Sequence, residues 1–154
     1  MKTQKERMAE LVKQFRFAIE KAKQSGERQE FFVKFPRGQC GNASDMLAQF
    51  LIDNGIDEIY YEFGVYCCKG PYNSQSHAWL KMDDLLIDIT ADQFMDFPPP
   101  LTNDTPIYIG PHIPYYDSFN TDKSTIHKHY GLDISWNNYS ELVNNYKTIL
   151  KYME

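Results

Sequence analysis

The sequence predicts an α+β fold in which helices pack against a small antiparallel sheet. Apolar residues recur at helical spacing near both ends of the chain and in one central segment, while residues 77–90 alternate as a β-hairpin does. At 154 residues, the chain can bury a core without disulfides or metals. We therefore expect a single domain over residues 1–154, with a central helix on the sheet and flanking helices at the N- and C-terminal ends.

The residue pattern predicts the hairpin in detail. If Asp83 and Asp84 form the turn, residues 78, 80 and 82 share a face with residues 85, 87 and 89, and all six side chains are apolar. A shift of one residue would bury the wrong set, so the pattern specifies the register. The opposite face then carries His77 and Asp88 as diagonal neighbours, about 7 Å apart at the backbone and within side-chain reach.

A core-facing helix is predicted over the segment that follows Cys40. From Ala43 to Leu51 the apolar residues fall on one stripe, and Asn54 with Gly55 predicts the end of the helix. Cys40 lies one turn before Ala43, at the N-terminus of the helix and on its buried side. The positive end of the helix dipole and the free N–H groups there stabilise a thiolate and lower the pKa of a thiol.

The residues around Cys40 suit a site for acyl chemistry. The free N–H groups, together with the side-chain amide of Gln39, can receive an oxyanion. Gly38 and Gly41 permit a tight turn and the close approach of a substrate backbone. Arg37 is expected either to assist the recognition of a carboxylate or to be a solvated loop charge, and the second interpretation is the simpler one.

A thiol, an imidazole and a carboxylate follow one another along the chain as Cys40, His77 and Asp88. In an activated cysteine nucleophile the thiolate attacks a carbonyl, the imidazole takes and returns the proton, and the carboxylate orients the imidazole. A lone cysteine is more often a buried apolar residue. The helix N-terminus and the shared face of the hairpin favour the catalytic interpretation of the three residues together.

The stretch from Gly38 to Phe94 resembles the core of the transglutaminase-like branch of the papain-like cysteine enzymes. The matching motifs are Gly38-Gln39-Cys40, His77-Ala78-Trp79 and Asp88-Ile89-Thr90. Residues 76–80 and 87–94 are also similar to small uncharacterised bacterial proteins of this kind. The resemblance implies a papain/transglutaminase-like fold with Cys40 as nucleophile, His77 as general base and acid, and Asp88 as the orienting carboxylate. Trp79 lies on the same face of the predicted hairpin as His77, and we expect it among the substrate-binding residues.

Composition limits the partners and the location of the protein. A net charge of −5 argues against nucleic-acid binding, which needs clustered positive charge. The chain has no apolar run near the ~20 residues of a membrane span, and residues 1–10 are charged and lack the apolar region of a secretory signal. Three cysteines give no disulfide framework. We expect a cytoplasmic protein that binds neither nucleic acid nor membrane.

The remaining segments are assigned from spacing and composition. In chain order they are a helix over residues 3–23, an extended run over 31–35, a strand over 56–68, a loop over 69–76, a rigid polyproline segment over 98–100, a strand over 106–110 and an aromatic-rich loop over 111–123. That last loop is expected either to line a cleft or simply to pack. Asn138 and Glu141 predict a capping box at the start of a final helix.

Two other groups of residues are given structural roles. Cys67 and Cys68 are adjacent on a predicted strand and therefore point to opposite faces, which disfavours joint metal binding. His112, His127 and His129 lie in loop-like sequence without a recognised ligand spacing. We expect no metal site and no other cofactor.

The residues leave two classes of function open. The first is a thiol enzyme that cleaves an amide bond through a thioester, as a peptidase, an amidase, a glutamine deamidase or, where an amine resolves the thioester, an acyltransferase. Hydrolysis of a protein or peptide substrate is preferred, because no cofactor or second domain is evident. The alternative is a catalytically silent papain-like scaffold that binds a protein or peptide partner through its many Tyr and Phe residues. The sequence leaves the oligomeric state open.

Overall fold

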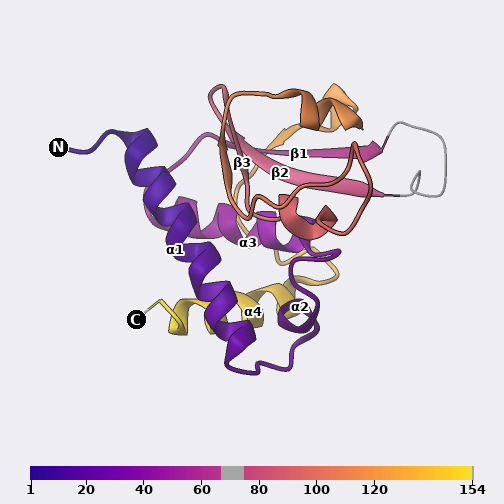
Figure 1. Ribbon diagram of the computed structural model, residues 1–154. Coiled ribbons are helices and arrows are strands. Elements are labelled where there is room, and N and C mark those ends of the chain that lie inside the picture. Colours follow the sequence, from indigo (N-terminus) through magenta and orange to yellow (C-terminus); the bar gives the residue numbers. More distant parts are fainter. Residues whose placement is uncertain (67–74, 154) are drawn as a thin grey trace.

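The computed structural model describes residues 1–66 and 75–153. This part of the chain forms four α-helices that gather on one side of an antiparallel sheet (Figure 1). The helices are α1 (Gln4–Gln24), α2 (Glu30–Lys34), α3 (Cys40–Asp53) and α4 (Tyr139–Lys151). The α+β class is confirmed, and so are the central helix that begins at Cys40 and the flanking helices near both ends.

The sheet of the described residues has the strand order β4-β3-β2-β1-β5, and β6 also pairs with β1. The strands are β1 (Ile59–Tyr66), β2 (Ser76–Met82), β3 (Leu85–Asp88), β4 (Tyr108–Gly110), β5 (Phe119–Thr121) and β6 (His127–Lys128). All pairs are antiparallel. In the β2–β3 hairpin Leu80 lies opposite Ile87 and Met82 opposite Leu85, which is the predicted register.

The predicted inner face of the hairpin forms part of the main core. Leu80, Met82, Ile87 and Ile89 are buried against side chains of α1, α3 and α4. The start of α1 is held by a capping box, in which Thr3 Oγ1 accepts from the N–H of Glu6. The two-residue period of the hairpin and the 3.6-residue period of the helices therefore identify the same core.

The outer face of the hairpin is buried as well, which was not predicted from the sequence. Residues 91–121 return over this face and cover it with a second core of aromatic and aliphatic side chains, namely Trp79, Leu86, Phe94, Leu101, Tyr116 and Phe119. The aromatic segment after residue 110 thus packs on the sheet through a 3-10 helix, η2 (Pro114–Ser118), and through β5. The expectation of a loop over 111–123 was therefore wrong in part.

A short 3-10 helix, η1 (Ala91–Phe94), follows the hairpin and is tied to α1. The buried guanidinium of Arg16 donates to the carboxylate of Asp92 at 2.7 and 3.0 Å and to the carbonyl oxygen of Ile89 at 2.5 Å. A bidentate pair of this kind holds both position and orientation. The residues just after β3 are therefore anchored to the helical layer.

Three local predictions were wrong. Residues 31–35 are not extended, because Phe31 and Phe32 are buried on the helix α2. The segment after Phe97 turns instead of running as polyproline, since the N–H of Leu101 donates to the carbonyl of Pro98 at 3.1 Å.

The capping box predicted for α4 is also absent. The side chain of Asn138 makes no capping bond and instead donates to Asn42 Oδ1 at 3.2 Å, so that a contact between α4 and α3 replaces a local one. Residues 67–68 of the predicted strand, most of the loop predicted over 69–76, and Cys67 with Cys68 lie outside the described residues.

Within residues 1–66 and 75–153, no helix combines the length and the apolar content of a membrane span.

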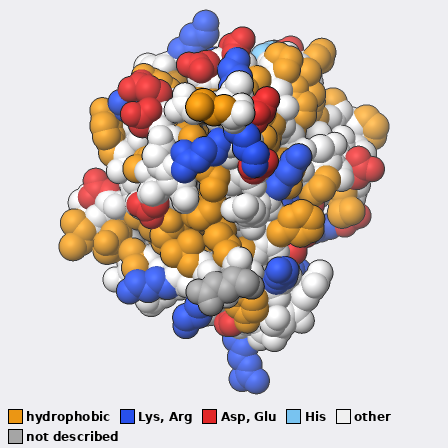
Figure 2. Space-filling model, turned by 90° about the vertical axis from the view of Figure 1, so that its left-hand side faces the viewer, with side chains coloured by type: hydrophobic (Ala, Val, Ile, Leu, Met, Phe, Trp, Pro, Cys, Tyr) orange, Lys and Arg blue, Asp and Glu red, His pale blue; other side chains and the backbone are white. Residues whose placement is uncertain are grey.

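On the α1 side of the molecule, hydrophobic side chains lie among charged ones (Figure 2). Two large hydrophobic side chains are exposed on these helices, Phe17 on α1 and Val33 on α2.

Candidate active site

Cys40 is the first residue of α3. The chain reaches it through Gly38, whose φ of 68° lies in the left-handed region that suits a residue without Cβ. Within the described part of the chain, the N–H groups of Cys40, Gly41 and Asn42 have no hydrogen-bond partner. The thiol therefore lies beside a set of free backbone donors at the positive end of a helix dipole.

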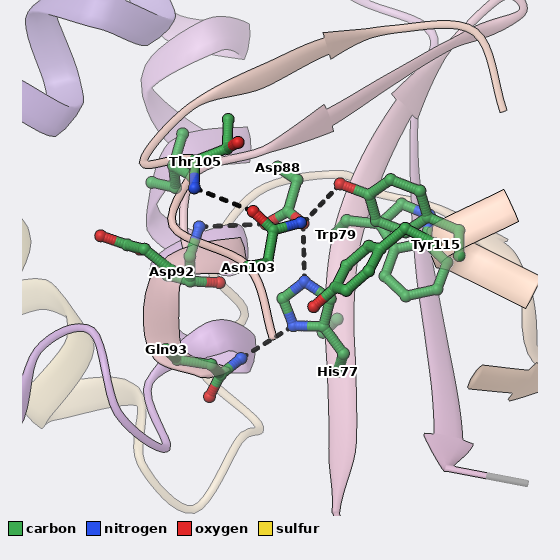
Figure 3. Close-up of polar contacts among 12 residues, drawn as sticks. His77, Trp79, Asp88, Asp92, Gln93, Asn103, Thr105 and Tyr115 are labelled. Carbon is green, nitrogen blue, oxygen red and sulfur yellow. Dashed lines mark hydrogen bonds and ion pairs between the residues drawn. The ribbon is translucent and has the colours of Figure 1, made fainter. Parts of the chain in front are cut away.

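His77 and Asp88 form a buried pair. His77 Nε2 lies 2.6 Å from Asp88 Oδ2, as the dashed line between them marks (Figure 3). The carboxylate also accepts from the hydroxyl of Tyr116 at 2.7 Å and from the N–H of Thr90 at 3.0 Å. Burial raises the pKa of Asp88, but the charge and hydrogen bond of His77, with these further donors, outweigh it and hold the pKa below its usual value.

Cys40 interacts with the same imidazole. Cys40 as a whole residue is 8% exposed. Burial raises the pKa of the thiol, but hydrogen bonding and charge from His77, with hydrogen bonds from Gln93 and the backbone of Ala78, lower it overall. Burial lowers the pKa of His77, whereas the charge and hydrogen bond of Asp88, and then Cys40, raise it overall. The imidazole of His77 therefore interacts with both Asp88 and Cys40, the other two residues of the predicted triad.

Gln93 is a site residue that was not predicted from the sequence. Its amide nitrogen Nε2 lies 2.8 Å from His77 Nδ1 (Figure 3). Its oxygen Oε1 accepts from the N–H of Gly38 at 3.1 Å. The side chain is buried. The available signal was its place five residues after Asp88, but the η1 helix that turns it back toward His77 was not predicted.

Aromatic rings enclose the imidazole on the outer side of the sheet. Ring centroids of Trp79, Phe94 and Phe119 lie 5.3–5.5 Å from that of His77. The ring of Tyr116 is stacked at 6.4 Å. These rings keep water from the His77–Asp88 pair, and charge interactions are stronger in such surroundings.

Gln39 and Gly41 lie beside Cys40 in α3. Gln39 is buried, and its Oε1 accepts from Asn42 Nδ2 at 3.1 Å. The amide NH₂ of Gln39 takes no part in that hydrogen bond. A Cβ on Gly41 would lie 3.4 Å from the hydroxyl of Tyr61, which shows how closely β1 approaches the start of α3. Burial and the nearby Asp45 and Cys40 raise the pKa of Tyr61.

Arg37 and Trp79 are placed differently. Arg37 is exposed and pairs with Asp96, which agrees with the simpler interpretation of a solvated charge. Trp79 lies in the second core behind His77, and its indole N–H donates to Glu62 Oε2 at 2.9 Å. This position gives Trp79 a packing contact with the imidazole, and its role in substrate binding remains a prediction.

The described residues contain no group of three His, Cys, Asp or Glu side chains that could hold a metal ion. His129 Nε2 pairs with Asp45 at 2.9 Å, and His112 Nε2 pairs with Asp117 at 2.7 Å. These histidines are therefore engaged in separate carboxylate contacts, that of His129 buried and that of His112 exposed.

Comparisons with known proteins give no relative. No family model, no curated protein and no solved structure matches the chain. The interpretation of the site therefore depends on its own geometry and chemistry.

Proposed function

We propose that the protein is a thiol enzyme of the papain-like, transglutaminase-like kind that cleaves an amide bond through a thioester on Cys40. One observation carries the proposal: a buried imidazole, hydrogen-bonded to Asp88 at 2.6 Å, adjoins a cysteine at the open N-terminus of a helix. A structural cysteine requires neither the carboxylate nor the free N–H groups. A nucleophilic cysteine uses both, the carboxylate to orient the imidazole and the N–H groups to receive the oxyanion.

The reaction follows from the placement of the donors. The proton of Cys40 Sγ moves to His77 Nδ1, and the thiolate adds to the amide carbonyl carbon. The negative oxygen accepts from the free N–H groups at the start of α3. His77 then gives its proton to the nitrogen of the scissile amide. The amine departs, and the acyl group remains bonded to Cys40 Sγ as a thioester. Water, activated by His77, adds to the thioester and releases the acid and the thiol.

The substrate class is suggested by an apolar strip on β1. Phe63 and Val65 are 39% and 42% exposed and lie on one face of the strand together with Tyr61. Phe63 pairs with Ala78, whose backbone is one of the groups that lower the pKa of the Cys40 thiol, so the strip lies next to the strand that faces the nucleophile. We propose a peptide or protein substrate with an apolar side chain close to the scissile carbonyl, and hydrolysis as the outcome.

Iodoacetamide labelling at mildly acidic pH tests the nucleophile. Selective labelling of Cys40 over Cys67 and Cys68 supports a thiol enzyme, because a thiolate that persists at low pH reacts faster. Equal and slow labelling of all three thiols favours the alternative, a silent scaffold that binds a protein or peptide partner. A panel of peptide and glutamine-amide electrophiles, applied to the parent chain and to Cys40→Ala, then identifies the preferred acyl group.

A further inference from the structure

The hydrogen bonds around His77 form one directed chain. The N–H of Gly38 bonds Gln93 Oε1 at 3.1 Å, Gln93 Nε2 lies 2.8 Å from His77 Nδ1, and His77 Nε2 lies 2.6 Å from Asp88. A backbone N–H can only donate, so the oxygen of Gln93 must face Gly38. The amide NH₂ therefore faces Nδ1 and also can only donate. Every bond is satisfied when Nδ1 carries a lone pair and Nε2 carries the proton.

Protonation of Nδ1 disturbs this chain. With a proton on Nδ1, two donors would face each other at the 2.8 Å separation of His77 and Gln93. Turning the amide over would move the conflict to Gly38, where two donors would meet at 3.1 Å. A donor without an acceptor is unfavourable in a buried site. Gln93 must therefore give up one of its two bonds when His77 takes a proton from Cys40.

We propose that Gln93 is a positioning residue that controls proton transfer from Cys40 to His77. Before transfer, its N–H donates to Nδ1 and stabilises the neutral imidazole. When the proton of Sγ moves to Nδ1, the same N–H changes its acceptor from Nδ1 to the anion that has formed. That anion is first the thiolate and then, on the basis of the proposed function, the oxyanion of the acyl intermediate.

The fold holds Gln93 where this role requires it. The pair between Arg16 and Asp92 anchors η1 to α1, and the backbone N–H of Gln93 donates to the carbonyl of Thr90 at 3.0 Å. Its amide interacts with Cys40 as well as with His77, so both acceptors lie within reach of one NH₂ group. Proton transfer thereby becomes coupled to the turn at Gly38 that precedes the nucleophile.

The groups facing His77 act in opposite directions. Asp88 on β3 and Cys40 on α3 favour a proton on the imidazole, and Gln93 on η1 opposes it. Tyr116 on η2 donates to Asp88 and not to a ring nitrogen. The side chain at position 93 should therefore set the pKa of His77 in a defined order: lowest with Gln, which donates, higher with Leu, which does neither, and highest with Glu, which accepts.

The test is an NMR titration of the His77 ring nitrogens in full-length ¹⁵N-labelled protein. A Cys40→Ala background removes the shared thiol proton, and the chains to compare carry Gln93, Gln93→Leu and Gln93→Glu. We expect the midpoint to rise in that order, by at least about one pH unit between Gln and Glu. In the parent, the neutral imidazole of His77 should carry its single proton on Nε2. A Leu midpoint at or below that of Gln, or a parent proton on Nδ1, would overturn the proposal.

A second measurement uses the thiol itself. With Cys40 present, Gln93→Glu should lower the rate of iodoacetamide labelling of Cys40 near pH 6 by about tenfold or more, because the added carboxylate opposes the thiolate. Gln14→Glu makes the same change of charge on the exposed side of α1 and should leave the rate unchanged. An unchanged rate in Gln93→Glu would contradict the inference.

Neither measurement requires acyl turnover. If position 93 controls the proton but no acyl substrate reacts, the proposed function alone is wrong. If turnover is found and the Gln93 variants titrate alike, the role of Gln93 alone is wrong. Should Gln93→Leu not fold, Gln93→Glu still keeps the acceptor for Gly38, and the position of the proton in the parent needs no variant at position 93.

Discussion

His77 Nε2 and Asp88 Oδ2 lie 2.6 Å apart, and both side chains are 0% exposed. The two residues come from adjacent strands of one hairpin, so the backbone that places one also places the other. The contact orients the imidazole and leaves its Nδ1 for Gln93, while the charge of the same ring lowers the pKa of Cys40. The pair is therefore both part of the packed structure and the centre of the proposed chemistry.

Asp88→Asn should abolish most of the activity while keeping the fold. The oxygen of the new amide can still accept from Thr90, and its NH₂ then faces His77 Nε2. His77 Nε2 must then become the acceptor, so the ring proton moves to Nδ1. Nδ1 is the nitrogen that should take the proton of Cys40, and it is then no longer free to do so. Turnover should fall by as much as ~10⁴-fold if catalysis depends fully on the orientation of His77 by the Asp88 carboxylate. The measurement is the rate of hydrolysis of whichever peptide electrophile labels the parent.

Asp84→Asn is the matched control, because Asp84 is exposed in the turn of the same hairpin. It should leave the rate almost unchanged. Full activity in both variants would show that Asp88 is an ordinary strand residue. An equal loss in both would show that the register of the hairpin was disturbed.

Tyr116→Phe should destabilise the fold and weaken the orientation of Asp88. The buried hydroxyl donates to the carboxylate at 2.7 Å, and a hydrogen bond to a charged group contributes about 1.5–3 kcal/mol. The free energy of unfolding in urea should fall by about this amount. Tyr115→Phe removes a weaker bond to the carbonyl of Leu101 at 3.4 Å and should have a smaller effect. Equal losses would show that the Tyr116 hydroxyl adds nothing specific.

Stability should depend on pH in a way that reports the His77–Asp88 pair. The lowered pKa of Asp88 contributes stability above about pH 3.9, which is lost as the pH falls through the folded pKa. The raised pKa of His77 contributes stability fully below about pH 6.5, and this is lost as the pH rises through the folded pKa. The difference in unfolding free energy between the parent and Asp88→Asn should be largest between about pH 4 and 6.5. A difference that is flat from pH 3 to 9 would contradict the coupling.

Phe63→Ala should weaken substrate binding more than it slows the chemical step. Phe63 belongs to the exposed apolar strip of β1, and its removal takes away apolar contact area. We expect KM for an apolar peptide to rise about tenfold, which corresponds to about 1.4 kcal/mol, with kcat changed less. Tyr60→Ala is the control, because Tyr60 is 37% exposed on the opposite face of the same strand. The same rise in both variants would remove the strip from the substrate site.

The sequence predicted the parts of the site that depend on local periodicity. The alternation around Leu80 and Ile87 gave the register of the hairpin, and hence the contact of His77 with Asp88. The helical stripe after Cys40 gave the start of α3. Each of these periodic patterns includes several neighbouring residues, so one residue that departs from the pattern does not change the prediction.

Features that depend on distant contacts were missed or wrong. Asn138 could have capped its own helix, but a contact with Asn42 on α3 replaces that local bond. Phe31 and Phe32 suit a strand by composition, and burial against the helical layer places them on a helix. Tertiary packing overrides intrinsic propensity in such short segments.

By itself, the sequence determined the α+β class, the register of β2 with β3 and the position of Cys40 at the start of a helix, because two- and 3.6-residue periods are properties of consecutive residues. Only the tertiary structure decided that residues 91–121 bury the outer face of the hairpin. That packing encloses His77 in aromatic rings and, with the Arg16–Asp92 anchor, places the amide of Gln93 at its Nδ1. These contacts depend on how the chain returns over its own sheet, and the spacing of residues along the chain does not encode that path.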